Sequence, residues 1–588
     1  MNESPIARRL RAVEGILGAC FLLLALRLLF LHTRPDPDRV KQAEASSRFV
    51  RLQPAPRGRI YDGSRTPVLL AASVPRRDLC ADPLILHLRT NQAAVVALAA
   101  SFLGLSPHRL DERLSDPSNR FVYIQRHLPE EVAEPLWTAI TNAGLHRGGG
   151  LYFRPSTFRQ YPHKDHLCHV IGFASRDVEE RGLMGLELAF DRWLRGRPGL
   201  IRGRRGAFWK ELYTRREDEH PPVPGADVYL TIDRTIQHFA EEALDEAMAT
   251  HRAKGAWAIV QRCQTGEILA MASRPAFDLN RFPESTADQR TNRAVSIVYE
   301  PGSIFKPVVL ALAFERKLVE PSQVFDTENG SWLHEGRILR DYHPYPRLSV
   351  ADILKKSSNI GTAKISLLLG NDYFYEGARR FGYGRRLGIE LPNEEAGLLW
   401  SPRSPNWSRL TCSRMAIGQG VAVTALQMAG MMSAIANGGY LLRPWLVRKV
   451  VAPDGTVLKQ GEPEVLARPI SSETAALMRY LLARVTEEGG TGTRARLEGY
   501  RVAGKTGTAQ KVVGGRYSET DYVASFAGFF PADQPELTIV VGVDEPQPYH
   551  TGGVVAAPIF ARIAQQTARY LALPPSPSSL EPETERRP

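Results

Sequence analysis

The sequence predicts an α+β protein of several domains behind one N-terminal membrane helix. Three observations support this prediction. The chain has 588 residues, more than one hydrophobic core usually organises. A long apolar stretch lies close to the N-terminus, and in the C-terminal half strand patterns stand on both sides of a helix-rich region. Strands at both ends with helices between them are typical of the α+β class.

The apolar stretch runs between Glu14 and His32 and is interrupted only by Arg27. Its length is close to the roughly 20 apolar residues that span a bilayer. Three arginines precede it: Arg8, Arg9 and Arg11. By the positive-inside rule, the first residues stay in the cytoplasm and the rest of the chain is exported. A cleaved signal peptide is the alternative, but the sequence LHTRPDPDRV that follows has no small-x-small cleavage site.

The composition excludes several classes of function. The formal charge of +12 suits an anionic partner, such as an acidic lipid surface or an anionic polymer. Nucleic acid is not expected, because the basic residues are scattered and no zinc-finger spacing or aromatic RNA-binding motif is present. The five cysteines form no C-x-x-C pair, and His334-Glu335 has Ile338 where a zincin needs its second histidine. No metal and no cofactor is predicted.

The exported part falls into two regions. Up to about residue 220 the sequence alternates short apolar runs, prolines, glycines and helical stretches such as Gln92 to Gly104. A proline-rich joint at His220 to Asp227 follows, and then the alternating strand VYLTID and a helical pattern from Arg234 to His251. We therefore place a domain boundary at this joint.

The C-terminal region begins and ends with strands. AWAIVQRC and ILAMAS form a strand pair around the turn residues Thr265-Gly266, and further strands are expected near Val502 and Ile539. The last residues, PSPSSLEPETERRP, cannot bury apolar surface and are expected to form a disordered tail.

Ser303 and Lys306 form the first candidate catalytic pair, in the sequence YEPGSIFKPVVLALAFE. Pro307 is tolerated only in a first helical turn, so the helix begins close to Ser303. Residues three apart share one helix face, which lets the Lys306 amine point at the Ser303 hydroxyl. A serine needs such a base, and burial lowers the pKa of a lysine enough to serve. An N-capping serine followed by an exposed lysine is the structural alternative.

Two further motifs favour the catalytic interpretation. Ser357-Ser358-Asn359 follows VADILKK, whose apolar spacing is helical, so a hydroxyl and an amide stand at a helix end. Lys505-Thr506-Gly507-Thr508 follows an apolar run that is typical of the entry to a strand. On an edge strand Gly507 would let a peptide approach the backbone, while Lys505 attracts a carboxylate and Thr506 hydrogen-bonds it. A polar helix end and a hairpin turn are the alternatives for these two motifs.

Ser-x-x-Lys, Ser-x-Asn and Lys-Thr-Gly in this order resemble the penicillin-recognising serine enzymes. Longer stretches resemble the class B penicillin-binding proteins over nearly the whole chain: PRGRIYD at Pro56 to Asp62, GLMGLELAFDRWLRG at Gly182 to Gly196, PGADVYLTID at Pro224 to Asp233, and NRAVSIVYEPGSIFKP at Asn292 to Pro307. The glutamate of EPGS, the asparagine of SSN and the threonine after KTG are similar to the division-specific FtsI group, although sporulation-type members share them.

The resemblance implies a domain organisation. It comprises a cytoplasmic tail at 1–13, a transmembrane anchor at 14–33, a pedestal-like or dimerisation-like domain at 34–222, a transpeptidase domain at 223–570 and a disordered tail at 571–588. The transpeptidase domain is expected to hold an antiparallel sheet with a helical subdomain. The protein is expected in the bacterial inner membrane as a single-pass protein, with most of the chain in the periplasm.

The resemblance also implies a reaction, the cross-linking of peptidoglycan stem peptides through an acyl-enzyme on Ser303, with septal wall synthesis as the expected role. Lys306 is then the base, Ser357 and Asn359 relay protons and hold the donor peptide, and Lys505 and Thr506 bind its terminal carboxylate. Gly507 and Thr508 also belong to the substrate-binding set, and the backbone N–H groups of Ser303 and Thr508 form the oxyanion hole. β-Lactams are expected inhibitors, and a SEDS-type glycan polymerase and other division proteins are expected partners.

Other functions stay open at this point. A sporulation-type or elongation-type class B transpeptidase is one alternative, although elongation-specific relatives usually carry different residues at the three diagnostic positions. A β-lactamase needs an added base, for which Glu390-Leu391-Pro392-Asn393 has the wrong spacing. A non-catalytic β-lactam sensor or division scaffold is a further alternative, which the complete motifs disfavour.

Overall fold

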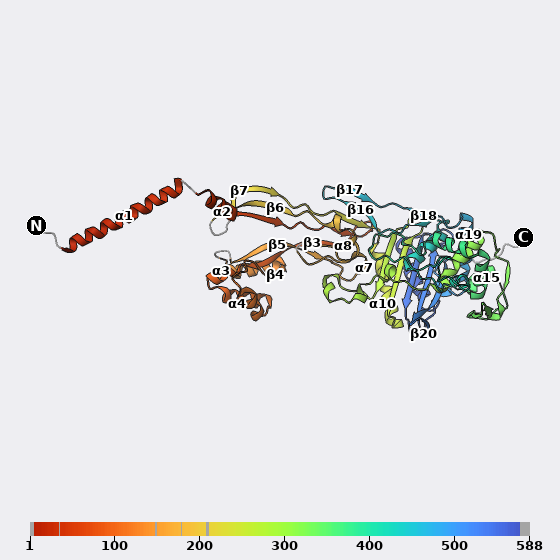
Figure 1. The fold of residues 1–588 in the computed structure, drawn as a ribbon. Coiled ribbons are helices and arrows are strands. Elements are labelled where there is room, and N and C mark those ends of the chain that lie inside the picture. Colours follow the sequence, from red (N-terminus) through yellow and green to blue (C-terminus); the bar gives the residue numbers. More distant parts are fainter. Residues whose placement is uncertain (1–4, 34–35, 147–149, 178, 207–210, 577–588) are drawn as a thin grey trace. The chain divides into compact units, whose positions relative to one another are not determined.

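The computed structural model describes residues 5–33, 36–146, 150–177, 179–206 and 211–576 (Figure 1). Contacts along the chain divide it into two compact units whose segments alternate in the sequence. The first unit comprises Met1–Ala55, Pro75–Thr157 and Arg197–Val223, and the C-terminal unit comprises Pro56–Val74, Phe158–Gly196 and Pro224–Pro588. Two segments of the module predicted at 34–222 therefore pack in the C-terminal unit.

The first unit contains the helices α1 (Pro5–Thr33), α2 (Pro37–Ser47), α3 (Pro83–Leu88), α4 (Gln92–Leu103), α5 (Pro107–Leu114) and α6 (Glu130–Asn142), and the strands β1 (Arg48–Gln53), β4 (Val122–Leu128), β6 (Gly199–Arg205) and β7 (Glu211–His220). Two more strands, β3 (Leu69–Ala81) and β5 (Leu151–Gln160), each contain a boundary between the units.

The C-terminal unit contains the helices α7 (Cys168–Ile171), α8 (Gly185–Ala189), α9 (Asp191–Leu194), α10 (Arg234–His251), η2 (Leu279–Glu284), α11 (Ala287–Arg290), α12 (Arg293–Ser296), η3 (Gly302–Phe305), α13 (Lys306–Glu315), η4 (Glu328–Gly330), α14 (Val350–Lys356), α15 (Asn359–Leu369), α16 (Asn371–Arg380), α17 (Thr411–Met415), α18 (Ala425–Ala436), α19 (Ser472–Thr486), η5 (Thr493–Ala495) and α20 (Ala556–Tyr570).

The strands of the C-terminal unit are β2 (Ile60–Tyr61), β8 (Asp227–Leu230), β9 (Gly255–Arg262), β10 (Ile268–Arg274), β11 (Val324–Asp326), β12 (Ser331–His334), β13 (Arg337–Arg340), β14 (Arg347–Ser349), β15 (Leu441–Leu442), β16 (Val447–Val451), β17 (Val457–Gln460), β18 (Val465–Ala467), β19 (Ala503–Val513), β20 (Arg516–Phe530) and β21 (Leu537–Asp544).

Helix α1 includes the predicted anchor. From Arg9 to Thr33 it is long and apolar enough to cross a membrane, with a mean hydropathy of 2.1, and none of this part is buried within the chain. The helix begins at Pro5, so it continues into the predicted cytoplasmic tail, because arginine and alanine are good helix formers. Residues 1–4 lie outside the described part.

The first unit has two parts besides α1 and α2. Strands β1, β6 and β7 form an antiparallel sheet in that order. Helices α3 to α6 pack with β4 around a separate apolar core that includes Leu79, Val95 and Leu136. Helix α4 coincides with the predicted helical stretch and ends at Gly104, whose left-handed backbone closes the helix.

A five-stranded antiparallel sheet forms the centre of the C-terminal unit, in the order β10-β9-β21-β20-β19. The predicted strand pair is β9 and β10, and the predicted helix from Arg234 to His251 is α10. Strand β19, which carries Lys505-Thr506-Gly507, lies at one edge of the sheet. The predicted α+β class with an antiparallel sheet is confirmed.

Helices cover both faces of this sheet. On one face α10 and α20 bury an apolar core in which Phe526 of β20 contacts Phe560 of α20. On the other face lies the helical subdomain, including α13, α18 and α19, whose core contains Trp257 and Phe529 of the sheet. Every residue of α18 is buried. The sheet edge at β19 contacts η3, the turn that carries Ser303.

A second sheet of this unit contains β17, β16, β8, β2 and the first part of β3, in that order. Strands β2 and β8 are parallel, with Ile60 opposite Val228. The segment 56–74 is thereby tied to residues that follow it by more than 150 positions in the sequence. Because this pairing is long-range, sequence order alone did not assign the segment 56–74 to the C-terminal unit.

The tail predicted from Leu571 onward is ordered in its first, described part. The Tyr500 hydroxyl donates to the Leu573 carbonyl oxygen at 2.6 Å, and the Ser576 backbone N–H donates to the Gly499 carbonyl oxygen at 2.9 Å. The prediction rested on composition, which does not report backbone hydrogen bonds. Residues 571–576 bind the loop before β19 largely through such bonds. The rest of the predicted tail, 577–588, lies outside the described residues.

Candidate active site

Ser303 lies in the single 3-10 turn η3, directly before α13. The turn begins at Gly302, whose φ of +55° is a left-handed backbone conformation that favours glycine. The Gly302 N–H donates to the Gly418 carbonyl oxygen at 3.3 Å, which fixes the approach to the turn. The half-buried Ser303 hydroxyl makes no hydrogen bond to any described residue. It is therefore free to meet a ligand.

Lys306 is the first residue of α13 and is completely buried. Its amine donates to the Ser357 carbonyl oxygen at 2.5 Å, to the Ser357 Oγ at 3.2 Å and to the Asn359 Oδ1 at 2.7 Å. The sequence had placed this amine against the Ser303 hydroxyl. The structure instead holds it on the second motif, which brings Ser-x-x-Lys and Ser-x-Asn together.

Burial lowers the pKa of Lys306 to about 7, against a smaller opposing effect of the Asp341 carboxylate. An ordinary lysine is almost wholly protonated at neutral pH and cannot accept a proton. With a pKa near 7, about half of the Lys306 amines are neutral at that pH. Lys306 therefore meets the requirement for a general base.

Ser357 and Asn359 lie where one helix ends and the next begins. Ser357 closes α14 with a φ of +61°, an uncommon conformation for a residue with a Cβ. Ser358 caps α15 by accepting from the Gly361 N–H, and Asn359 is the first residue of α15. The sequence predicted the end of the first helix and not the start of the second. The sharp turn directs both the carbonyl and the hydroxyl of Ser357 at Lys306.

Asp341 is a positioning residue, and no sequence motif indicates it. Its carboxylate accepts from the Ser358 hydroxyl at 2.6 Å and from the Ile360 N–H at 3.0 Å, and it also accepts from the Asn359 N–H. These bonds satisfy the first N–H groups of α15 and place a negative charge at its positive end. Asp341 lies in the loop after β13, and only the folded chain brings it to this helix.

Lys505 projects from the edge strand β19 and is also completely buried. Its amine donates to the Ser357 Oγ at 2.9 Å and to the Thr506 carbonyl oxygen at 3.2 Å. Burial, and then the charge of Lys306, hold the pKa of Lys505 well below its ordinary value. The Ser357 hydroxyl therefore lies within hydrogen-bond distance of both lysine amines, a chain along which a proton can pass.

Gly507 allows the strand to pack closely against the turn that carries Ser303. A Cβ on Gly507 would lie 2.5 Å from the Ser525 Oγ and 2.8 Å from the Ile304 Cγ1. Ser525 stands opposite Gly507 on β20, and Ile304 follows Ser303. A side chain at this position would therefore push β19 away from the nucleophile.

The two threonines of the third motif have defined partners. The Thr506 Oγ1 lies 2.9 Å from the Thr491 Oγ1, and the Thr508 Oγ1 accepts from the Gly552 N–H at 3.1 Å. Because β19 is an edge strand, alternate backbone groups face away from β20 and are available to a ligand. Thr491 lies in the loop after α19 and was not predicted from the sequence.

The glutamate of EPGS is also tied to this region. The Glu300 Oε1 accepts from the Gly420 N–H at 2.7 Å and from the Tyr517 hydroxyl at 3.2 Å. Burial raises the pKa of Glu300 above its ordinary value, although these two donors oppose the shift. Glu300 thereby links the segment directly before Ser303 with β20 through Tyr517.

The residues considered as a lactamase base lie elsewhere. The Glu390 carboxylate accepts from the Leu446 N–H at 2.9 Å and lies 3.8 Å from the Lys459 amine. Within the described chain it makes no hydrogen bond or ion pair with Ser303, Lys306 or Lys505. Glu390 is therefore not arranged to activate a water molecule at this site.

All three sequence motifs thus converge on one side of the sheet edge. A half-buried serine hydroxyl without a hydrogen bond, a lysine with lowered pKa, a bridging serine and a second buried lysine are the components of serine acyl transfer. The arrangement defines a serine acyltransferase site.

Comparison with known proteins agrees with this class. The family model described as the penicillin binding protein transpeptidase domain matches residues 256–565, and the one described as the penicillin-binding protein dimerisation domain matches residues 52–230. The chain therefore belongs to the penicillin-binding protein family, as a transpeptidase of class B.

Relatives match over nearly the full length. A probable peptidoglycan D,D-transpeptidase, PenA of Neisseria meningitidis, is 34% identical over 95% of this chain and 93% of its own. The peptidoglycan D,D-transpeptidase FtsI of Escherichia coli is 31% identical over 95% of this chain and 92% of its own. Penicillin-binding protein 3 of Mycobacterium tuberculosis, solved in complex with aztreonam, has a TM-score of 0.68 at 29% identity and covers 91% of this chain and 100% of its own. The family predicted from the motifs is confirmed.

Proposed function

We propose that this transpeptidase cross-links peptidoglycan stem peptides during septal wall synthesis, with Ser303 carrying the acyl group. The observation that supports the role of Ser303 most directly is the chain of contacts from Lys306 through Ser357 to Lys505, beside an unengaged serine hydroxyl. The enzyme is a peptidoglycan D,D-transpeptidase, so the donor is a stem peptide that ends in D-Ala-D-Ala.

In the acylation step, the Ser303 Oγ attacks the carbonyl carbon of the penultimate D-alanine, and the neutral Lys306 amine accepts the hydroxyl proton. Backbone N–H groups of Ser303 and Thr508 hydrogen-bond the developing oxyanion, a contribution of roughly 3 kcal/mol for one donor. The bond between the two alanines then breaks, and the departing amine receives a proton through Ser357. Terminal D-alanine leaves, and an ester to Ser303 remains.

In the transfer step, the amine of a second stem peptide attacks the ester carbonyl. A base takes one proton from this amine, and the Ser303 oxygen regains a proton as the ester bond breaks. Asn359, whose side-chain N–H donates to the Arg340 carbonyl oxygen at 2.8 Å, holds the donor peptide. Lys505 and Thr506 bind the carboxylate of the donor before acylation, and Gly507 and Thr508 provide the strand along which the peptide lies.

The septal role is supported by Glu300, Asn359 and Thr508, which match the division-specific pattern, and by the similarity to FtsI of Escherichia coli. Helix α1 supports anchoring in the inner membrane with most of the chain in the periplasm. We propose the domain organisation and the partners on the same basis: a pedestal-like module ahead of the transpeptidase domain, a SEDS-type polymerase that supplies glycan strands, and other division proteins.

Labelled penicillin is expected to bind covalently to the wild-type protein and not to the Ser303→Ala variant. A β-lactam carbonyl reacts with the same nucleophile as the donor peptide, and alanine has no oxygen to acylate. Gel fluorescence after denaturation measures the covalent label, and circular dichroism checks that the variant is folded. Persistent labelling of the alanine variant would refute the assignment, and release of the label within seconds would favour a β-lactamase.

Cells in which the Ser303→Ala chain replaces the native one are expected to grow as filaments without septa. Loss of septal cross-linking blocks division while the side wall continues to extend. Microscopy with a fluorescent D-amino acid measures where new cross-links form. Rounded cells would instead indicate the elongation role, and a defect restricted to spores would indicate the sporulation role.

A further inference from the structure

A cavity of about 450 Å³ lies in the C-terminal unit, away from the motif residues described above. Three segments that are distant in the sequence line it: 169–185 around α7 and α8, 287–296 in α11 and α12, and 391–393. Its volume is within the range of protein sites for small ligands and peptide side chains. Neither the proposed reaction nor any of the three motifs uses it.

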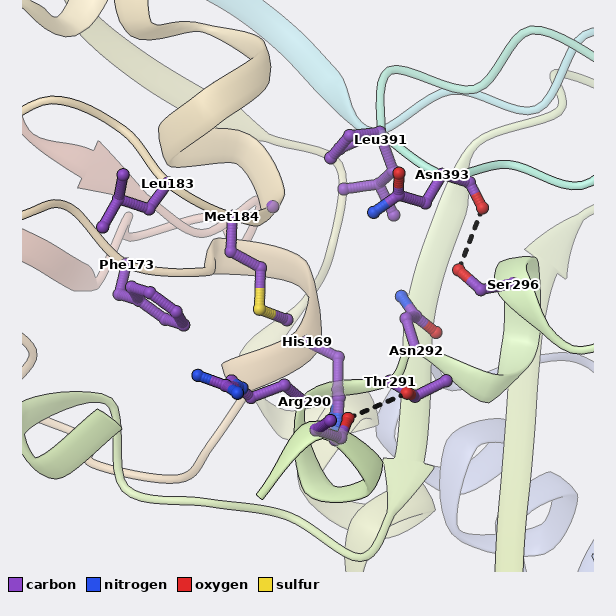
Figure 2. A pocket seen from close by; sticks show the side chains of 13 residues that line it. His169, Phe173, Leu183, Met184, Arg290, Thr291, Asn292, Ser296, Leu391 and Asn393 are labelled. Carbon is purple, nitrogen blue, oxygen red and sulfur yellow. Dashed lines mark hydrogen bonds between the residues drawn. The ribbon is translucent and has the colours of Figure 1, made fainter. Parts of the chain in front are cut away.

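The lining divides into two kinds of surface, which Figure 2 shows. Phe173, Leu183 and Met184 lie on one side and provide apolar contact. Asn292, Ser296 and Asn393 lie on the other side and are polar. Leu183 is 50% exposed, so part of the apolar wall is open to solvent. An occupant of this cavity must therefore have an apolar group and hydrogen-bonding groups.

Arg290 gives the cavity a positive charge that no other lining residue balances. The lining residues include no carboxylate. The side chain of Arg290 makes no hydrogen bond or ion pair with another described residue. Two other arginines of this region do have carboxylate partners: Arg281 pairs with Glu284 at 2.5 Å, and Arg293 pairs with Asp288 at 2.6 Å.

The histidine of the cavity does not add to this charge. Burial lowers the pKa of His169 to about 4, so the ring is neutral at pH 7, and its Nε2 lies 2.7 Å from the Gln289 carbonyl oxygen. Arg290 is thus the formally charged group of the lining. A guanidinium beside apolar surface favours a carboxylate, which it binds through two parallel hydrogen bonds.

The polar side of the cavity suits a peptide. The backbone oxygen of Asn393 accepts from the Ser296 hydroxyl at 2.9 Å, which fixes the loop, while the exposed Asn393 amide makes no hydrogen bond within the described chain. A side-chain amide has both donors and an acceptor and pairs with a peptide group.

We propose that this cavity binds a segment of a protein partner that carries a carboxylate next to an apolar side chain. The carboxylate pairs with Arg290, the apolar side chain packs on Phe173 and Met184, and a peptide group of the segment pairs with the Asn393 amide. The charge of Arg290 provides selectivity for the carboxylate, and the apolar wall provides contact area.

The test uses the full-length protein in nanodiscs, first treated with benzylpenicillin so that the catalytic site is blocked. The probes are the peptide acetyl-Leu-Phe with a free C-terminal carboxylate and the same peptide with a C-terminal amide. Isothermal titration calorimetry measures binding to the wild type, to Arg290→Met and to the control Arg281→Met. Methionine keeps much of the length and apolar surface of arginine and removes its charge.

We expect saturable binding of the carboxylate peptide, and about tenfold to a hundredfold weaker binding of the amide peptide. Arg290→Met is expected to weaken binding of the carboxylate peptide by the same factor, while Arg281→Met leaves it unchanged. Penicillin labelling of both variants verifies that they are folded. The proposal is wrong if the carboxylate peptide does not bind at millimolar concentration, if the amide peptide binds equally well, or if Arg290→Met binds like the wild type.

Discussion

Replacing Lys306 by alanine is expected to slow the acylation of Ser303 by labelled penicillin by about a hundredfold to ten-thousandfold. The neutral Lys306 amine is the proposed acceptor of the serine proton, since burial lowers its pKa to about 7. Lys505 remains in the variant, but its amine contacts Ser357 and Thr506. Stopped-flow or quenched-flow labelling measures the rate constant.

The wild-type acylation rate should also rise with pH, because the lowered pKa of Lys306 determines where the base becomes deprotonated. The base is active when deprotonated, so below about pH 7 the rate should fall close to tenfold for each pH unit, and above it the rate should level off. The Lys306→Ala variant should lose this dependence. A rate that rises as the pH falls would contradict the assignment of Lys306 as the base.

Lys364→Ala is the matched control for this experiment. Lys364 lies on α15, the helix that carries Asn359, and its amine bonds to the Asp326 carbonyl oxygen at 2.9 Å and to Glu328 at 2.7 Å. Among the described residues it makes no hydrogen bond or ion pair with Ser303, Lys306 or Lys505, so its removal should leave the acylation rate unchanged. A comparable loss in both variants would indicate a structural effect in place of lost base catalysis.

Replacing Glu187 by glutamine is expected to reduce the free energy of unfolding of the C-terminal unit by about 3–5 kcal/mol. Glu187 is completely buried, and its two oxygens lie 2.6 Å from the Arg57 Nε and 2.6 Å from the Arg159 Nε. Arg57 keeps Asp191 as a partner at 2.6 Å, whereas Arg159 has no second carboxylate within the described chain. The substitution therefore leaves a buried guanidinium without its counter-charge.

The pH dependence of this loss follows from the pKa of Glu187. Burial raises that pKa, but the charges of Arg159 and Arg57 outweigh burial and hold it below its ordinary value. A carboxyl with a depressed pKa stabilises the fold above its unfolded pKa, and the stabilisation is lost as the pH falls through the folded pKa. The difference between wild type and variant should therefore be largest near neutral pH and shrink in acid.

Urea unfolding followed by tryptophan fluorescence measures both effects, with Glu179→Gln as the control. Glu179 lies in the same segment and pairs with Arg181 at the surface, where both side chains are more than half exposed. Its replacement should not move the midpoint, because surface ion pairs contribute little. Equal midpoints for Glu187→Gln and the wild type at pH 7 would show that this ion cluster is not needed for stability.

The candidate catalytic residues could be selected from the sequence because each motif has a local physical signature. Pro307 restricts where a helix can begin, and η3 and α13 begin within a few residues of it. The apolar run before Lys505 predicted a strand, and β19 begins at Ala503. These features depend on the backbone preferences of a few neighbouring residues, which a sequence reports directly.

The contacts among the motifs were not predictable in the same way. The sequence paired Lys306 with Ser303 by helical spacing, but its amine bonds to Ser357 and Asn359, about 50 positions away. Asp341 and Thr491 have no motif around them, and each acts through a residue that only the folded chain brings near. The direction of a buried side chain depends on every group that surrounds it.

The sequence by itself determined the α+β class, through periodicity, and the family, through its resemblance to known motifs. It also predicted an apolar N-terminal helix and a set of candidate catalytic residues, because periodicity and spacing record local conformation and side-chain chemistry. The tertiary structure decided which segments belong to which unit. Buried charges join the segments 56–74 and 158–196 of the C-terminal unit: Arg57 pairs with Glu187 across 130 positions, and Arg159 pairs with Glu187 across 28. The sequence does not identify the ion-pair partner of a charged residue, because an ion pair depends on distance in space.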